Sequence, residues 1–155
     1  MISPELLRRF PFFGSIEPEF LRQIAMFSEE ISFDKDSTIF EEGSSAEYLY
    51  FLITGSIDLY FSVHEETRPD VRKEYYTGCI NPGEVFAISG LIEPYCYIAT
   101  ARPSTNSTII RVDASALRQL LEEQPKLGCL MLRQIARVAM ERLNTTRVQL
   151  AAAWS

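Results

Sequence analysis

The chain has 155 residues, which suits one domain with a helical appendage, and its 46% apolar and 23% charged residues are ordinary for a globular protein. The formal net charge of −6 argues against nonspecific attraction to nucleic acid or to an anionic membrane surface. No run approaches the roughly 18 apolar residues of a transmembrane helix, and the N-terminus lacks the apolar core of a secretory signal. Three widely spaced cysteines (Cys79, Cys96 and Cys129) form no metal-type pair, which favours a reduced, cytoplasmic setting.

The first 27 residues are predicted to form two short helices. Ser3 can cap the first, over Pro4–Arg9, because its hydroxyl can accept a backbone N–H and Pro4 suits the first helical turn. The second runs from about Glu17 to Met26, where apolar side chains recur at helical spacing.

Residues 28–112 alternate β-rich runs with clusters of turn residues such as Asn81-Pro82-Gly83. The predicted strands are Glu30–Phe33, Thr38–Phe40, Tyr48–Thr54, Ser56–His64, Arg72–Tyr76, Val85–Ala87, Tyr97–Ala101 and Ser107–Arg111. Many short strands at this spacing favour an antiparallel jelly roll, that is, a double-stranded β-helix.

From Ala114 onward the hydrophobic period becomes helical. Asp113 can cap a helix that begins at Ala114, and Gln124-Pro125 marks its end. A longer helix is predicted from Pro125 to about Ala152. The sequence therefore predicts an α+β fold, in which an antiparallel β jelly roll carries N-terminal helices and a long C-terminal helix.

Several motifs resemble those of one family. Ile39–Gly43 followed by Tyr48–Ile57 is similar to the strand–turn–strand signature of the cyclic-nucleotide-binding domain, the sensor part of CRP/FNR-like regulators. Gly43 and Gly55 would then supply tight turns with positive φ. Further along, Pro82–Phe86 resembles the turn that leads into the family's phosphate-binding cassette.

Two later segments continue the resemblance in the same order. Ala99–Ala101 is similar to the segment after the cassette arginine, and Ile109–Asp113 to the last strand and helix cap. The resemblance implies one stand-alone domain over 1–155, divided into N-terminal helices (1–27), jelly roll (28–112) and C-terminal helices (113–155). It also leads us to expect no DNA-binding domain and no direct contact with DNA or membrane.

The resemblance further implies how a ligand would be held. In the family, a Phe-Gly-Glu-Leu segment opens a short helix whose backbone N–H groups point at the cyclic phosphate. Its glutamate accepts from the ribose 2′-hydroxyl, and a later arginine pairs with the phosphate. Here that segment reads Phe86-Ala87-Ile88-Ser89, and Tyr97 stands at the arginine position. The candidate pocket comprises Phe86, Ala87, Ile88, Ser89, Tyr97, Ile98 and Ala99.

Both ionic contacts of the family are therefore missing. A hydrogen bond to a charged group contributes about 1.5–3 kcal/mol, and a buried phosphate without its cation costs about 2–5 kcal/mol. At about 1.4 kcal/mol per tenfold change, a micromolar site would weaken to about millimolar or beyond. Arg102 is the nearest arginine, but its odd separation from Tyr97 along a strand places it on the opposite face.

Three interpretations of the cassette stay open at this point. The first is a collapsed site filled by its own side chains. The second is a pocket retuned for an apolar or aromatic ligand, with Tyr97 as the stacking face. The third is residual binding of cAMP or cGMP through backbone N–H groups and Ser89.

No catalytic or metal chemistry is predicted. A jelly-roll metal site needs two or three histidines, and the chain has only His64, near a loop. Some relatives with altered pockets are haem sensors, but no axial ligand is placed for that role here. Cys96 neighbours Tyr97 and could sense oxidation, although an inert thiol fits better. We expect no cofactor and no enzymatic activity.

The last helix carries an apolar surface broad enough for two partners, its own barrel and a second helix. The resemblance implies that this helix forms the seam of a homodimer, with Arg133, Arg137, Arg142 and Arg147 near its exposed side. The expected dimer residues are Leu132, Ile135, Ala136, Ala139 and Leu143.

The expected function is regulatory. The chain would be a sensor or binding module for a small-molecule effector, with weak or no binding of cAMP or cGMP. The alternatives are a ligand-free dimeric adaptor that binds a protein partner, and a sensor for a different ligand.

Overall fold

The computed structural model describes residues 1–68 and 70–155. Its N-terminal part contains α1 (Pro4–Arg8), the 3-10 turn η1 (Pro11–Phe13) and α2 (Pro18–Met26). The predicted cap is confirmed, because the Ser3 hydroxyl accepts the N–H of Glu5 at 3.3 Å. A proline begins each of the three segments, where its missing N–H leaves no helical hydrogen bond unmade.

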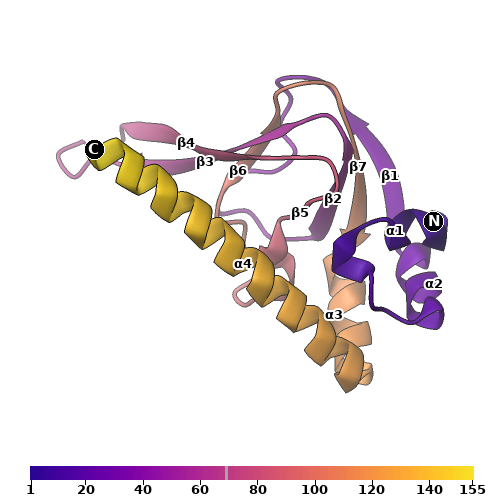
Figure 1. Cartoon of the computed structure of the whole chain (residues 1–155). Helices are drawn as coiled ribbons and strands as arrows, with labels where there is room; N and C mark the ends of the chain where they lie inside the picture. The colour runs from indigo at the N-terminus through magenta and orange to yellow at the C-terminus, as the bar shows by residue number, and fades with distance from the viewer. Residues whose placement is uncertain (69) are drawn as a thin grey trace.

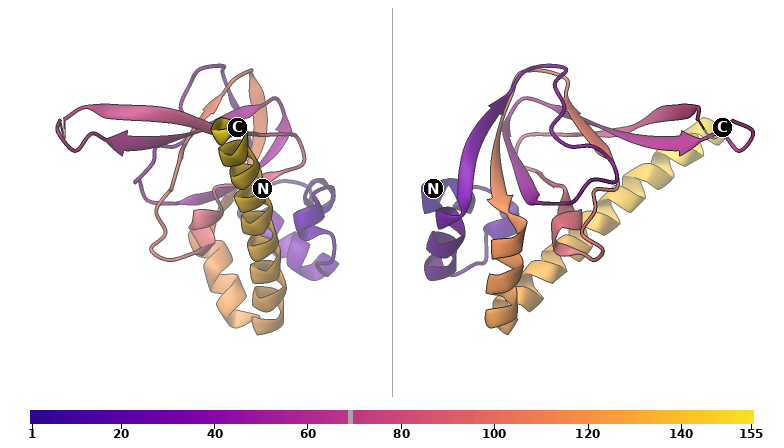
Figure 2. Two further views of the ribbon diagram at one scale, coloured as in Figure 1. Left: turned by 60° about the vertical axis from the view of Figure 1, so that its left-hand side comes forward. Right: turned by 180° about the vertical axis from the view of Figure 1, so that it is seen from behind.

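The middle of the chain forms two antiparallel sheets, as predicted for a jelly roll (Figure 1). The strands are β1 (Ser28–Phe33), β2 (Tyr48–Thr54), β3 (Ile57–His64), β4 (Arg72–Ile80), β5 (Val85–Phe86), β6 (Thr100–Pro103) and β7 (Ser107–Asp113). One sheet has the order β1-β7-β2-β5 and the other the order β4-β3-β6. Figure 2 shows β3 and β4 projecting from the body as a long hairpin.

Two predicted strands are shorter or absent in the structure. Thr38–Phe40 forms no strand, since only Phe40 makes an isolated bridge, to Ala101. The predicted strand Tyr97–Ala101 begins only at Thr100. Its earlier residues pair with a loop instead, because Tyr97 exchanges backbone hydrogen bonds with Gly43 and Ser44.

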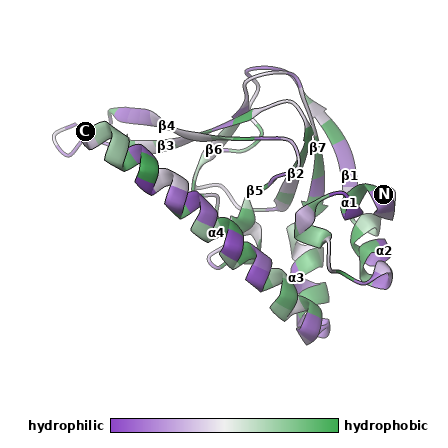
Figure 3. Ribbon diagram, viewed as in Figure 1, coloured by the Kyte–Doolittle hydropathy of each residue, from purple (hydrophilic) through white to green (hydrophobic). Residues whose placement is uncertain are grey.

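The C-terminal part contains α3 (Ala114–Glu123) and α4 (Pro125–Trp154). Asp113 caps α3 as predicted, since its carboxylate accepts the N–H of Ala116 at 2.9 Å. Figure 1 shows α4 running diagonally from α3 past β5 toward the end of the molecule that carries the β3–β4 hairpin. Hydrophobic and hydrophilic residues alternate along its whole length (Figure 3). None of the helices in residues 1–68 and 70–155 has the length and hydrophobicity of a membrane-spanning segment.

The sheet that contains β2 separates two hydrophobic clusters. Leu49 and Phe51 of β2 face the helical cluster, which they share with side chains of α1, α2, α3 and α4. Tyr50 and Leu52 face the barrel cluster, inside the jelly roll. This alternation follows from the pleat of a strand. The same alternation in β5, at the edge of this sheet, places Val85 in the helical cluster and Phe86 in the barrel cluster.

Candidate functional site

The cassette follows β5 in the chain and packs against the start of α3. After β5 the chain turns at Ala87 and forms the 3-10 helix η2 (Ile88–Leu91). Gly90 of η2 packs so closely on the start of α3 that an added Cβ would lie 3.1 Å from the Cβ of Ala114. The cassette is thus seated directly on the C-terminal helices.

Two residues that flank η2 have left-handed backbone conformations. Ala87 has φ 63° and Tyr95 has φ 58°, although neither is glycine. Such a conformation costs about 1–2 kcal/mol in a residue with a Cβ, so it persists only where the surroundings hold it. The resemblance aligns Ala87 with a glycine of the family, and its backbone has a conformation that glycine would favour.

Tyr97 is built into the interior of the barrel. Its hydroxyl accepts the N–H of Tyr48 at 3.2 Å and donates to the carbonyl oxygen of Tyr48 at 3.1 Å. Its ring stacks on that of Phe40, with centroids 3.9 Å apart and planes 20° apart. Only 5% of the residue is exposed. The side chain at the arginine position therefore fills space and completes a backbone hydrogen-bond pair.

Further aromatic rings continue this packing. Phe40 stacks on Tyr50 with centroids 5.6 Å apart, and Tyr50 stacks on Phe86 with centroids 5.2 Å apart. Burial raises the pKa of the Tyr50 hydroxyl far above its usual range, and the neighbouring Tyr97 adds to that effect. Burial likewise raises the pKa of Tyr97. Both hydroxyls stay neutral at physiological pH and offer no charge to an anion.

The structure divides the seven predicted pocket residues among different surroundings. Phe86, Ala87 and Tyr97 lie together in the barrel cluster. Ile88 packs against the helical cluster instead, so it points toward the helices. The remaining residues of the set, Ser89, Ile98 and Ala99, do not join either cluster.

Ile98 points away from the other members of the predicted set that lie in the barrel. It is 76% exposed and lies outside the barrel. The reason is the alternation of an extended chain, because the inward direction of Tyr97 sends its neighbour outward. Ser89 and Ala99 are half-buried.

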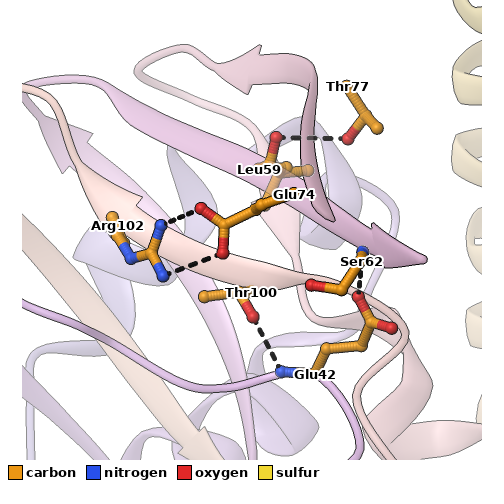
Figure 4. Close-up of polar contacts among 7 residues, drawn as sticks. All are labelled: Glu42, Leu59, Ser62, Glu74, Thr77, Thr100 and Arg102. Carbon is orange, nitrogen blue, oxygen red and sulfur yellow. Dashed lines mark hydrogen bonds and ion pairs between the residues drawn. The ribbon is translucent and has the colours of Figure 1, made fainter. Parts of the chain in front are cut away.

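Arg102 lies on the outer face, as predicted. Its guanidinium forms a two-point ion pair with the carboxylate of Glu74 on β4 (Figure 4). The same guanidinium lies 5.0 Å from the centroid of the Tyr60 ring. These contacts hold Arg102 against neighbouring strands on the outer face. It is therefore not positioned to act as the cassette arginine.

Beside this pair, Glu42 ties the loop before β2 to both neighbouring strands. Its carboxylate accepts the N–H of Ser62 on β3, and its own N–H donates to the Thr100 hydroxyl, each at 3.0 Å (Figure 4). Both contacts are structural, since they satisfy backbone groups beside Thr100, where β6 begins.

Two arginines from the C-terminal helices hold the cassette. Arg118 of α3 donates to the carbonyl of Gly90 at 2.6 Å and lies 4.1 Å from the centroid of the Tyr95 ring. Arg142 of α4 donates to the carbonyl of Val85. Arg142 was predicted to lie near the exposed side of the helix, and that prediction is wrong. Its spacing of seven residues from the buried Ile135 was the signal, since such positions share one helix face.

The expected dimer residues fall into two groups. Ile135 is 4% exposed and packs in the chain's own helical cluster, so it is unavailable to a second helix. Leu132 and Leu143 are 47% and 58% exposed, and Ala136 and Ala139 are also exposed. These four share a stripe that faces away from the helical cluster.

The exposed side of α4 also carries two open hollows, both away from the cassette. One, of about 530 Å³, is lined by Arg133, Ala136, Arg137, Met140, Glu141 and Asn144. The other, of about 420 Å³, is lined by Arg147, Leu150, Ala151 and Trp154.

Within residues 1–68 and 70–155, no group of three or more His, Cys, Asp or Glu side chains is arranged to hold a metal ion. Cys79, Cys96 and Cys129 are free thiols.

Comparison with known proteins identifies a family and several structures that this chain resembles. Residues 30–124 match the family described as the cyclic nucleotide-binding domain. A crystal structure from Geobacter metallireducens, described as a candidate cyclic nucleotide-binding protein, is 34% identical, with a TM-score of 0.81 over 92% of this chain and 99% of that one. A regulatory subunit of a cAMP-independent protein kinase A from Trypanosoma brucei shares the fold at 13% identity, with a TM-score of 0.73 over 96% of this chain and 49% of that one.

Among curated proteins, a CRP-like cAMP-activated global transcriptional regulator of Mycobacterium tuberculosis is 26% identical over 147 residues, or 95% of this chain. The chain spans 61% of the length of that regulator. The match to the family covers more than half of the chain and agrees with the fold and the order of the motifs. The chain belongs to the cyclic nucleotide-binding domain family.

Proposed function

We propose that this chain is a regulatory module that does not recognise cAMP or cGMP through the ionic contacts of its family, because its cassette is closed by its own side chains. The observation that carries the proposal is Tyr97. At the arginine position it is buried, stacked on Phe40 and hydrogen-bonded twice to the backbone of Tyr48.

A cyclic phosphate at this position would lack a cation. Tyr97 has no charge, and its one proton is already donated to the Tyr48 carbonyl. Turning the side chain away would leave two half-buried backbone groups of Tyr48 unpaired, each at a cost of up to about 1–3 kcal/mol. The ligand would have to supply that free energy without an ion pair.

Ile88 argues in the same direction. It stands where the family has the glutamate that accepts from the ribose, and it packs against the helical cluster. Restoring a carboxylate contact would require the residue to leave apolar surroundings. The cassette is thus joined to the helices by an apolar side chain, with no need of a nucleotide.

The protein from T. brucei offers a parallel. It is described as cAMP-independent, and a form with three substitutions, one of them threonine to arginine, is described as bound to cAMP. Those words concern that protein, but they suggest the corresponding experiment here.

Calorimetric titration with cAMP and with cGMP, at near-physiological salt, tests the proposal. We expect no heat and no thermal shift up to millimolar nucleotide. Binding at micromolar concentration or tighter would overturn the proposal, since the backbone N–H groups would then suffice without the two ionic contacts.

A designed variant adds a case in which nucleotide binding is expected. Ala87→Gly, Ile88→Glu and Tyr97→Arg together restore the family's cassette and are expected to create or strengthen nucleotide binding. The matched control is Ile98→Arg, which adds the same charge to the neighbouring, outward-facing position. It is expected to leave binding absent.

We also propose that the module works as a homodimer joined through α4. The supporting observation is the exposed stripe of Leu132, Ala136, Ala139 and Leu143, which recurs at the spacing of a two-helix seam. A dimer with a closed cassette would act as an adaptor for a protein partner. Both roles are regulatory binding and need no catalysis.

A further inference from the structure

The C-terminal half of α4 has a single partly buried side chain. Ile135 is the last fully buried residue of the helix, and Val138 is half-buried. From Ala139 to Trp154 every residue is exposed except Arg142. Its guanidinium reaches the backbone of β5 and donates to the carbonyl of Val85.

The edge position of β5 explains why that carbonyl needs a partner. Toward β2, the neighbouring carbonyl of Glu84 accepts the N–H of Leu52 at 3.1 Å. Successive carbonyls of an extended strand point in opposite directions, so that of Val85 points to the open edge of the sheet. Val85 is only 5% exposed, and a buried carbonyl without a donor is unfavourable. Arg142 satisfies it from the helix.

The surroundings of Arg142 act on its charge in opposite directions. Burial lowers the pKa of Arg142, while the charges of Glu84 and Glu141 raise it. The Glu84 carboxylate accepts the N–H of Asn81 at 2.7 Å, within the turn before β5. The acceptor that Arg142 holds is a neutral carbonyl, which binds a guanidinium less strongly than an anionic oxygen does.

We propose that Arg142 is a latch that fixes the direction of the C-terminal half of α4 relative to β5 and the cassette. Because β5 leads directly into Ala87 and η2, Arg142 ties the helix to the strand from which the cassette starts. From Arg142 to Trp154 the helix extends about 18 Å, at about 1.5 Å per residue. A small rotation at the latch therefore becomes a displacement of several ångströms at the helix end.

The latch is independent of nucleotide binding. It concerns a hydrogen bond within the chain, and its test involves no nucleotide. It also links the cassette to the part of α4 that bears Leu143, on the exposed stripe.

Distances between two spin labels test the latch. One label is placed on the exposed Cys79 of β4 and the other on the variant Ala152→Cys, with Cys96→Ser and Cys129→Ser removing the other thiols. Dilution with unlabelled protein restricts the measured distances to pairs within one chain. With Arg142 present, we expect one narrow distance distribution.

The variants Arg142→Gln and Arg142→Met are expected to lose that single narrow peak and to give a broad or shifted distribution. Arg142→Lys, which keeps a cationic donor, is expected to retain more of it. Arg137→Gln is the matched control, since Arg137 is exposed on the same helix.

An unchanged distribution in a folded Arg142→Gln or Arg142→Met protein would show that the helix is held without the latch. Circular dichroism and a thermal melt confirm that each variant is folded. The two substitutions differ in polarity, so that failure of one to fold leaves the other to decide.

Discussion

At the scale of single residues, Tyr97 shows how one side chain can complete the barrel interior. Its ring stacks on Phe40, and its hydroxyl forms two hydrogen bonds to the backbone of Tyr48. Ile98, the next residue of the extended chain, points outward. The same backbone that could frame a ligand is here satisfied from within the chain.

Glycine conformation at the two predicted turns gives a test at this scale. Gly43 has φ 87° and Gly55 has φ 105°, as their motifs predicted. A Cβ on Gly43 would meet nothing within 4 Å, whereas one on Gly55 would lie 2.1 Å from the Ser107 hydroxyl oxygen and 2.8 Å from its Cα. We expect Gly43→Ala to lower the free energy of unfolding by about 1–2 kcal/mol, from backbone strain alone.

Gly55→Ala should cost about 1–3 kcal/mol more than its control, because the clash adds to the strain. Urea denaturation of both variants measures the difference. Equal losses would mean that the β7 start at Ser107 can move aside and that close approach does not fix this turn.

At the scale of elements, local sequence signals predicted the helices and most strands. The caps at Ser3 and Asp113 are side-chain chemistry that a sequence displays directly, and both are confirmed. The segment Thr38–Phe40 was expected to be a strand but makes only one isolated bridge. A run of residues with high β propensity forms a strand only where a neighbouring strand pairs with it along its length. The spacing of Arg142 from Ile135 indicated a shared helix face, but its acceptor is a backbone carbonyl at a sheet edge, which no residue type reveals.

The exposed stripe on α4 supports a prediction of its own. Leu143→Glu places a charge at the C-terminal end of the proposed seam, where a buried unpaired carboxylate is unfavourable. We expect the dimer to dissociate, as measured by light scattering coupled to size-exclusion chromatography. Thr145→Glu adds the same charge on another face of the helix and should leave the mass unchanged. A monomeric native protein, or a Leu143→Glu variant that stays dimeric, would remove α4 from this role.

At the scale of the whole molecule, the sheet that contains β2 lies between the two hydrophobic clusters, and its strand β5 contributes a side chain to each. Val85 packs with the helices and Phe86 with the barrel, so the cassette strand is braced on two sides. Arg118 and Arg142 add polar ties from α3 and α4. The barrel interior and the C-terminal helices are therefore mechanically connected without a ligand, and a change in the barrel interior should affect the stability of the entire fold.

The buried tyrosines make that stability sensitive to alkaline pH. The folded-state pKa values of Tyr50 and Tyr97 are raised by burial above the usual value of 10.0. Below pH 10 both hydroxyls are neutral in the folded and unfolded chain, and their contribution to stability is fully present. Above pH 10 the unfolded chain loses these protons while the folded chain retains them. The free energy of unfolding should then fall by up to about 1.4 kcal/mol per pH unit for each tyrosine.

Tyr50→Phe keeps the stacked ring and removes one ionisable hydroxyl, so it should reduce the alkaline slope by up to half of the pair's contribution. Urea denaturation from pH 8 to about pH 11.5, the range that spans the onset of tyrosine ionisation, gives the slope for each protein. Tyr75→Phe, at a 45% exposed ring on β4, is the matched control. If Tyr50→Phe and the native protein lose stability at the same rate above pH 10, the Tyr50 hydroxyl must reach solvent. The barrel interior would then be open enough to admit a ligand.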